Sequence, residues 1–187
     1  MDPGATDLPI RIPTGALVLL IGPSGSGKST FAARHFDAGA VTSSDRLRGL
    51  LAGDEADQRA TEAAFQQLNH WLEARLEAGA LAVVDATNVE WMRRAELIGR
   101  ARREGRPAVA IAFALPLDLC LARSAARRRR VGAPVIRRQH DELRRSLNLL
   151  DLEGFSAVHV LRSDAEIERV AVHIEKGPAV RALSADD

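Results

Sequence analysis

The sequence lacks the features that stabilise secreted or membrane-bound proteins. Its 187 residues include one cysteine, Cys120, which excludes an intrachain disulfide and fits a reducing compartment. The longest apolar run, residues 108–115, is eight residues long, whereas a membrane span needs about 18. The first ten residues are acidic, without the basic and then apolar order of a signal peptide. We therefore expect a cytoplasmic protein with no membrane partner.

A metal-binding pattern is also missing. The five histidines show no ligand spacing, and one cysteine cannot complete a zinc site. Cys120 is therefore interpreted as a packing residue. The aromatic content is 4%, and Trp71 and Trp91 are interpreted as core residues rather than stacking platforms, with Trp91 close enough to a candidate site to border it.

Lysine is nearly absent, because Lys28 and Lys176 stand against 24 arginines. The net charge is +1, but it is unevenly distributed. Residues 117–150 contain nine arginines and three acidic residues, which gives this segment a charge of +6 and leaves −5 for the rest of the chain. Such asymmetry indicates either an anionic partner or a solvated basic helix face, and the charge alone leaves both interpretations open.

Short apolar runs alternate with amphipathic segments along the chain. The runs predict strands at 17–21, 40–43, 81–84, 108–115 and 157–161. The segments between them predict helices at 29–36, 60–78, 90–104, 117–130 and 135–150, and a last helix that begins at Ala165 with Asp164 as its cap. This alternation predicts an α/β fold with a doubly wound parallel sheet of about five strands. We expect one domain over residues 1–187, with a lid at about 117–150 and a loose tail at about 177–187.

A glycine-rich loop follows the first of these strands and opens a helix. Its sequence, Gly22-Pro23-Ser24-Gly25-Ser26-Gly27-Lys28-Ser29, fits the pattern G-x-x-x-x-G-K-[ST]. The glycines let backbone N–H groups turn around phosphate oxygens, and the helix adds its positive N-terminal end. Lys28 then reaches the β- and γ-phosphates, and the Ser29 hydroxyl binds Mg²⁺. The motif predicts binding of a nucleoside triphosphate, ATP, with Mg²⁺.

Acidic residues follow the next two strands, at the sheet edge where ligands bind in such folds. Asp45 can accept the proton of an attacking hydroxyl, and Arg48 can hold a phosphate of the acceptor. Asp85 resembles a Walker-B aspartate that supports Mg²⁺, through a water molecule. Both aspartates also fit the role of helix caps, and the residues alone leave these interpretations open.

The basic segment supplies two further candidates, Arg123 and Arg127. They are four residues apart, so on one helix their guanidinium groups lie on the same face. A lid that carries them can neutralise charge on a transferring phosphoryl group.

Together these blocks resemble the polynucleotide 5′-kinase family, above all the kinase module of bacterial RNA-repair enzymes that also carry phosphatase and ligase activities. The likeness runs from about Pro13 to Leu161. The matching blocks are residues 22–32 (GPSGSGKSTFA, which includes Thr30), Ser43-Ser44-Asp45 with Arg48, residues 83–89 (VVDATNV), and Arg123, Arg127, Arg130 and Val131 with residues 135–138 (VIRR).

The resemblance implies Mg²⁺-dependent transfer of the γ-phosphate of ATP to a 5′-hydroxyl end of RNA or DNA. It makes Asp45 the general base and lets Arg48 hold the phosphate 3′ to the reacting hydroxyl. Lys28, Arg123 and Arg127 would stabilise the transition state. Arg130 and Val131 would lie near the adenine.

Other functions stay open at this point. The chain has no D-x-D-G-T phosphatase signature and no K-x-D-G ligase nucleophile, so it is either a stand-alone kinase or a module of a larger repair enzyme. A small-molecule kinase on the same scaffold is one alternative, and a non-catalytic nucleotide-dependent module is another. The sequence does not decide between a monomer and a homodimer.

Overall fold

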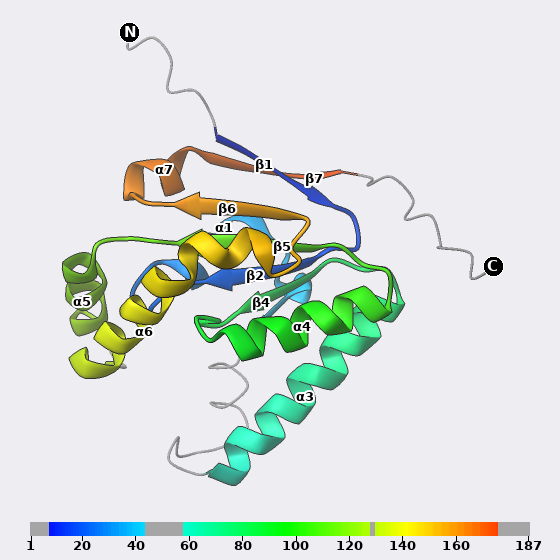
Figure 1. Ribbon diagram of the computed structural model, residues 1–187, viewed down its shortest axis with the longest axis horizontal. Coiled ribbons are helices and arrows are strands. Elements are labelled where there is room, and N and C mark those ends of the chain that lie inside the picture. Colours follow the sequence, from blue (N-terminus) through cyan, green and yellow to red (C-terminus); the bar gives the residue numbers. More distant parts are fainter. Residues whose placement is uncertain (1–7, 44–57, 128–129, 176–187) are drawn as a thin grey trace, which may run out of the picture.

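A five-stranded parallel sheet forms the centre of the computed structural model, which describes residues 8–43, 58–127 and 130–175 (Figure 1). Its strands lie in the order β3-β4-β2-β5-β6, and all four neighbouring pairs are parallel. Their bounds are β2 Leu17–Ile21, β3 Val41–Ser43, β4 Ala82–Asp85, β5 Ala108–Phe113 and β6 Ala157–Leu161. The predicted fold class is confirmed.

Helices connect these strands and lie on both faces of the sheet (Figure 1). They are α1 Lys28–His35, α3 Gln58–Glu77, α4 Trp91–Arg103, α5 Leu117–Ala125, α6 Ala133–Ser146 and α7 Asp164–Arg169, with short 3₁₀ turns η1 Ala38–Ala40 and η2 Leu147–Leu152. None of the described helices is both long and apolar enough to cross a membrane. The segment predicted as a lid contains α5, α6 and part of η2, and Cys120 is fully buried where α5 and α6 pack together, as its interpretation as a packing residue requires.

The strands divide their side chains between two cores because successive residues of a strand point to opposite faces. In β5, the alanines at 108, 110 and 112 pack toward α4 and α6, while Val109, Ile111 and Phe113 pack toward α1. All six residues of β5 are buried, which explains why this strand appears in the sequence as an unbroken apolar run.

A second, two-stranded sheet was not expected from the sequence. β1 (Leu8–Pro13) pairs in parallel with β7 (Val170–Glu175), with Leu8 opposite Val170 (Figure 1). Ile10 and Ile12 of β1 are buried against the core on the α1 face. β1 contains Pro9 and Pro13, which suit an edge strand because proline has no N–H to donate.

Three sequence-based expectations are wrong. Ser163, rather than Asp164, caps α7, because the Ser163 hydroxyl accepts the Glu166 N–H. α5 ends at Ala125, five residues before the predicted end. Trp91 is not a core residue, since it is 55% exposed at the start of α4, whereas Trp71 packs against the core. The tail predicted at 177–187 lies outside the described residues.

Candidate active site

The glycine-rich loop joins β2 to α1 at the carboxyl edge of the sheet. Gly27 caps α1 with a φ of 92°, and Gly25 has a φ of 86°, both in the left-handed region that favours glycine. A Cβ on Gly25 would also collide with the carbonyl oxygen of Cys120 in α5. Glycine at this position therefore lets the backbone of α5 rest directly on the loop.

Lys28 holds this loop in shape from within. Its Nζ donates to the carbonyl oxygens of Gly22, at 2.8 Å, and Pro23, at 2.9 Å, and to the Ser26 hydroxyl at 3.3 Å. The side chain is only 7% exposed. Its ammonium group thus lies along the loop, where it adds positive charge to the backbone N–H groups and to the N-terminus of α1.

A small polar pocket of about 40 Å³ opens above the loop, and its lining suits phosphate groups; we call it the phosphate cradle. Its lining residues are Ser24, Gly25, Gly27, Lys28, Ser29, Asp85, Ala86, Thr87 and Arg127. Three segments that are distant in sequence therefore meet here: the glycine-rich loop, the end of β4 with its following loop, and the residues after α5. Arg127 reaches the cradle from beyond the end of its helix, so helical spacing is not what places it.

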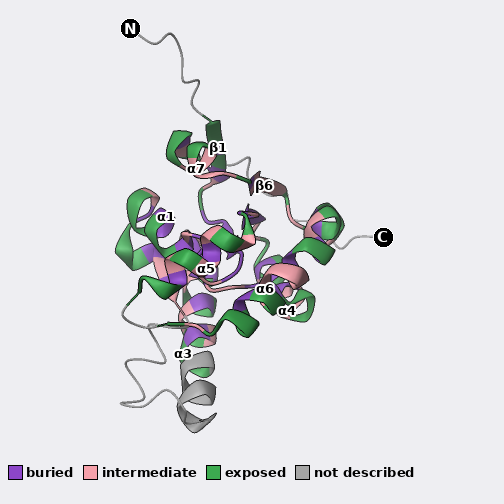
Figure 2. Ribbon diagram, turned by 90° about the vertical axis from the view of Figure 1, so that its left-hand side faces the viewer, coloured by how far each residue is buried: buried purple, intermediate pink, exposed green. Residues whose placement is uncertain are grey.

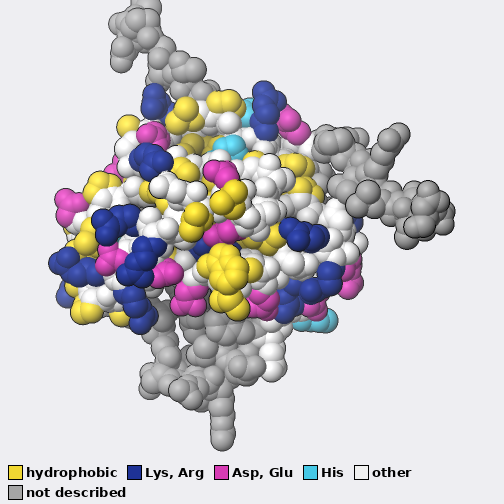
Figure 3. All heavy atoms as spheres, viewed as in Figure 1, with side chains coloured by type: hydrophobic (Ala, Val, Ile, Leu, Met, Phe, Trp, Pro, Cys, Tyr) yellow, Lys and Arg dark blue, Asp and Glu magenta, His cyan; other side chains and the backbone are white. Residues whose placement is uncertain are grey.

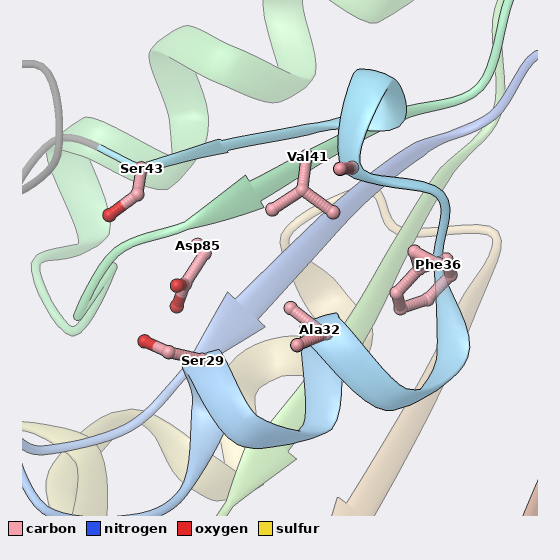
Figure 4. A pocket seen from close by; sticks show the side chains of 8 residues that line it. Ser29, Ala32, Phe36, Val41, Ser43 and Asp85 are labelled. Carbon is pink, nitrogen blue, oxygen red and sulfur yellow. The ribbon is translucent and has the colours of Figure 1, made fainter.

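Asp85 and Ser29 face one another at the edge of the cradle (Figure 4). Asp85 is the last residue of β4 and is 7% exposed, and Ser43, opposite it in register on β3, directs its hydroxyl toward the same space (Figure 4). A carboxylate and a hydroxyl are hard oxygen ligands, which Mg²⁺ prefers, and Mg²⁺ takes its other ligands from water and phosphates. The residues present therefore fit a magnesium ion bound together with a nucleotide.

The loop after β4 is fastened to the glycine-rich loop and to β2. The Gly22 N–H donates to the Thr87 carbonyl at 2.8 Å, and the Asn88 amide donates to the carbonyls of Leu20, at 2.8 Å, and Val84, at 3.3 Å. Asn88 has a φ of 46°, a left-handed conformation that asparagine tolerates. The alternative interpretation of Asp85 or Asn88 as a cap of α4 is wrong, because Glu90 occupies that position without a side-chain cap.

Arg123 lies over the glycine-rich loop and is paired with an acidic residue of α7. Its Nη1 is 3.9 Å from where a Cβ on Gly27 would be. Its Nη2 donates to Asp164 at 2.8 Å, an ion pair in which both side chains are partly exposed. Arg123 and Arg127 therefore both lie beside the loop, but only Arg127 lines the phosphate cradle. The pairing with Asp164 was not predicted from the sequence.

A second contact joins the lid segment to the loop. The Gln139 side chain of α6 accepts the backbone N–H of Ser24 at 2.9 Å. A glutamine on a helix rich in arginine carries no sequence signal for such a contact, so this residue was missed. Figure 2, which views the molecule from this side, shows α5 across the middle with α1 on one side and α6 on the other.

The other predicted site residues are not among those that line the cradle, or they lie outside the described residues. Arg130 is exposed, and Val131 exchanges hydrogen bonds of 3.3 Å with the Ser124 hydroxyl through its N–H and its carbonyl. Thr30 is exposed on the first turn of α1. Asp45 and Arg48 lie outside the described residues.

Burial raises the pKa of the Cys120 thiol, against the opposing charges of Lys28 and Arg123, so this thiol stays protonated beside the loop.

A family model described as an AAA domain, AAA_33, matches residues 17–150. The chain belongs to this family. The match includes the glycine-rich loop, Asp85, Arg123 and Arg127, and it implies nucleotide binding, usually with Mg²⁺. The fold is that of P-loop NTPase-like kinases. No curated protein is similar enough to the chain to count as a match.

Solved structures with this fold act on different substrates according to their descriptions. One is the Pnkp1/Rnl/Hen1 RNA repair complex, with a TM-score of 0.65 and 20% identity over 76% of this chain and 47% of the other, so the chain spans about half the length of that protein. A sugar kinase from Janibacter sp. HTCC2649 has a TM-score of 0.53 and 21% identity, covering 82% of this chain and 91% of the other. A gluconokinase from Sinorhizobium meliloti 1021 has a TM-score of 0.51 and 16% identity, covering 83% and 87%. At these identities, the likeness shows the fold alone.

Proposed function

We propose that the protein transfers the γ-phosphate of ATP to the 5′-hydroxyl end of RNA or DNA. The observation that carries the proposal is the placement of two arginines of the basic segment, Arg127 in the cradle and Arg123 over Gly27. Phosphoryl transfer depends on positive charge beside the transferring group rather than on covalent chemistry. The resemblance of the sequence blocks to polynucleotide 5′-kinases supports a nucleic-acid acceptor.

In the proposed mechanism, the loop N–H groups and Lys28 hold the phosphates of ATP. Ser29 and Asp85 would hold Mg²⁺, which would neutralise negative charge on the phosphates of ATP. Asp45 takes the proton of the 5′-hydroxyl while the hydroxyl oxygen forms a bond to the γ-phosphorus. At the same time the bond between the γ-phosphorus and the oxygen that bridges it to the β-phosphate breaks, which releases ADP. Arg123 and Arg127 stabilise the negative charge on the γ-phosphoryl oxygens as this happens.

Other residues would bind the acceptor and ATP outside the reacting groups. Arg48 would hold the phosphate 3′ to the reacting hydroxyl, as the resemblance implies. Arg130 and Val131 would border the adenine of ATP. Both groups of contacts keep the reacting atoms aligned, which lowers the barrier by fixing the geometry before reaction.

A second candidate function is phosphorylation of a sugar or a sugar acid. It is favoured by the coverage of the sugar kinase and gluconokinase folds, each of which extends over more than four-fifths of this chain. Such an acceptor carries few phosphates, so its use would be nearly independent of salt and of polynucleotide length.

The deciding experiment is transfer of ³²P from γ-labelled ATP to matched acceptors. These are a 5′-hydroxyl RNA, a DNA of the same sequence, a nucleoside 3′-phosphate and gluconate. We expect labelling of the polynucleotides, and Asp45→Asn should abolish it while ATP binding remains. Asp151→Asn, an exposed aspartate on η2, is the matched control and should label normally. Labelling of gluconate alone would establish the second candidate, and nucleotide turnover without any labelled acceptor would indicate a switch module.

A further inference from the structure

A second, larger pocket of about 370 Å³ adjoins the phosphate cradle between α1, η1 and the ends of β3 and β4 (Figure 4). Its size falls within the range of about 300–1,000 Å³ that small-ligand sites occupy. Only its rim, where Ser29 and Asp85 lie, takes part in the proposed phosphoryl transfer. The chemistry of the pocket differs sharply from one end to the other.

The polar residues of this pocket gather at one end. Ser29, Ser43 and Asp85 lie together there, as Figure 4 shows. Ser29 and Asp85 also line the phosphate cradle, so the two pockets share this wall. A hydroxyl group at the shared wall is therefore next to the γ-phosphate position, with the rest of its molecule directed away from the cradle.

The other end of the pocket is apolar. It is lined by the side chains of Ala32, Ala33, Phe36, Ala38 and Val41. These side chains offer neither a charge nor a hydrogen-bond donor or acceptor. They give a phosphate or the hydroxyl groups of a sugar nothing to hydrogen-bond with, so burial of such groups against them is costly.

A flat heteroaromatic ring meets these conditions, because its faces are apolar and its edge can stay near the rim. We propose that this pocket binds the base of the acceptor's 5′-terminal nucleotide, an inference that rests on the proposed polynucleotide kinase function. One nucleoside carries both the reacting 5′-hydroxyl and a base on the same sugar ring. The hydroxyl can therefore lie at the wall formed by Ser29 and Asp85 while the base enters among Ala33, Phe36 and Val41.

The test compares two acceptor oligonucleotides that differ only at the 5′ end. One ends in an ordinary nucleotide and the other in an abasic sugar with the same 5′-hydroxyl. We expect the wild-type kcat/KM to be about tenfold higher with the base present, because contact of one base with a protein surface contributes on this scale. The KM for ATP should be the same with both acceptors.

Ala33→Leu narrows the pocket from the exposed face of α1 and keeps a strong helix former at this position. We expect it to remove the preference for the base-bearing end while transfer to the abasic end stays within about twofold of wild type. Ala33→Met, with a more flexible side chain, should give a smaller loss of preference. Ala74→Leu, an equivalent exposed alanine in α3, is the matched control and should keep the full preference.

The outcomes separate this inference from the proposed function. Equal use of the two acceptors by the wild type would overturn the base pocket while the kinase function stands. If both Ala33 variants keep the preference for the base-bearing acceptor, the base binds elsewhere, and this result would also overturn the base pocket. Absence of transfer to either oligonucleotide, with gluconate labelled, would overturn the proposed function itself.

Discussion

Arg123 and Arg127 are only four residues apart, but their side chains contact different groups. Arg123 lies within α5 and is paired with Asp164, whereas Arg127 lies beyond the helix end and lines the phosphate cradle. Arg127 therefore lies where, in the proposed mechanism, it would face the transferring phosphoryl group. The charge of Arg123 is shared with a carboxylate 2.8 Å away, which holds the guanidinium over the loop.

We predict that Arg127→Ala lowers kcat by on the order of 100-fold or more, because removal of a donor to developing charge has effects of this size. The KM for ATP should change much less, since the loop and Lys28 still hold the phosphates. Rapid-quench or steady-state transfer to a 5′-hydroxyl oligonucleotide measures both constants. Arg103→Ala, an exposed arginine at the far end of α4, is the control. An unchanged kcat in Arg127→Ala would remove this residue from the mechanism.

At the scale of elements, Arg94 joins three segments around the end of β4. Its side chain is fully buried, and its guanidinium donates to both carboxylate oxygens of Glu153, at 2.7 and 2.6 Å. It also donates to the carbonyls of Asn88, at 2.9 Å, and Val89, at 2.6 Å. Arg94 thus fixes α4 and the segment after η2 to the loop that follows Asp85.

We predict that Arg94→Ala lowers the free energy of unfolding by about 3–5 kcal/mol, because it leaves the Glu153 carboxylate buried without its partner. The double variant Arg94→Met with Glu153→Leu should be far less destabilised, since neither charge then remains. Urea unfolding measures the free energy of unfolding of the single and the double variant. Arg145→Ala breaks an exposed pair with Glu142 and should change stability by less than about 1 kcal/mol. A small effect of Arg94→Ala would show that Glu153 is readily hydrated.

The elements of the central sheet could be predicted because each has a local signal. β2 and β5 are apolar runs, and Gly22 to Ser29 has a spacing that only a phosphate loop requires. The contacts around the site could not be predicted, since they join residues distant in sequence. Asn88, Arg94 and Gln139 have ordinary residue types for loops and helices, and only the folded chain brings them to their partners.

At the scale of the whole molecule, the pairing of β1 with β7 shows the same limit. Leu8 and Val170 lie at opposite ends of the described chain, and β1 contains two prolines that weaken any strand signal. Parallel pairing over such a separation is decided by the buried faces of Ile10 and Ile12 rather than by local propensity. The small sheet therefore depends on packing against the α1 face of the central sheet, for which the sequence carries no local signal.

The charge of the molecule also has meaning only in three dimensions. The net charge is +1. Figure 3, which has the same view as Figure 1, nevertheless shows Lys and Arg side chains gathered where α5 and α6 lie. α6 carries four exposed arginines, Arg137, Arg138, Arg144 and Arg145. A local basic surface of this kind suits a strand end, because it attracts phosphates near the site without making the whole protein basic.

We therefore predict a moderate salt dependence of the kcat/KM for a 5′-hydroxyl oligonucleotide. If the protein neutralises about three phosphates of a single strand, the slope of log kcat/KM against log salt concentration is about −2. A nucleoside 3′-phosphate has no atmosphere of condensed counterions to release, so its slope should be close to zero. Both slopes are measured between about 50 and 200 mM KCl, with ATP and Mg²⁺ saturating. Equal slopes would mean that the α5 and α6 arginines do not contact the strand, and a much steeper oligonucleotide slope would mean that the strand follows the basic surface well beyond its end.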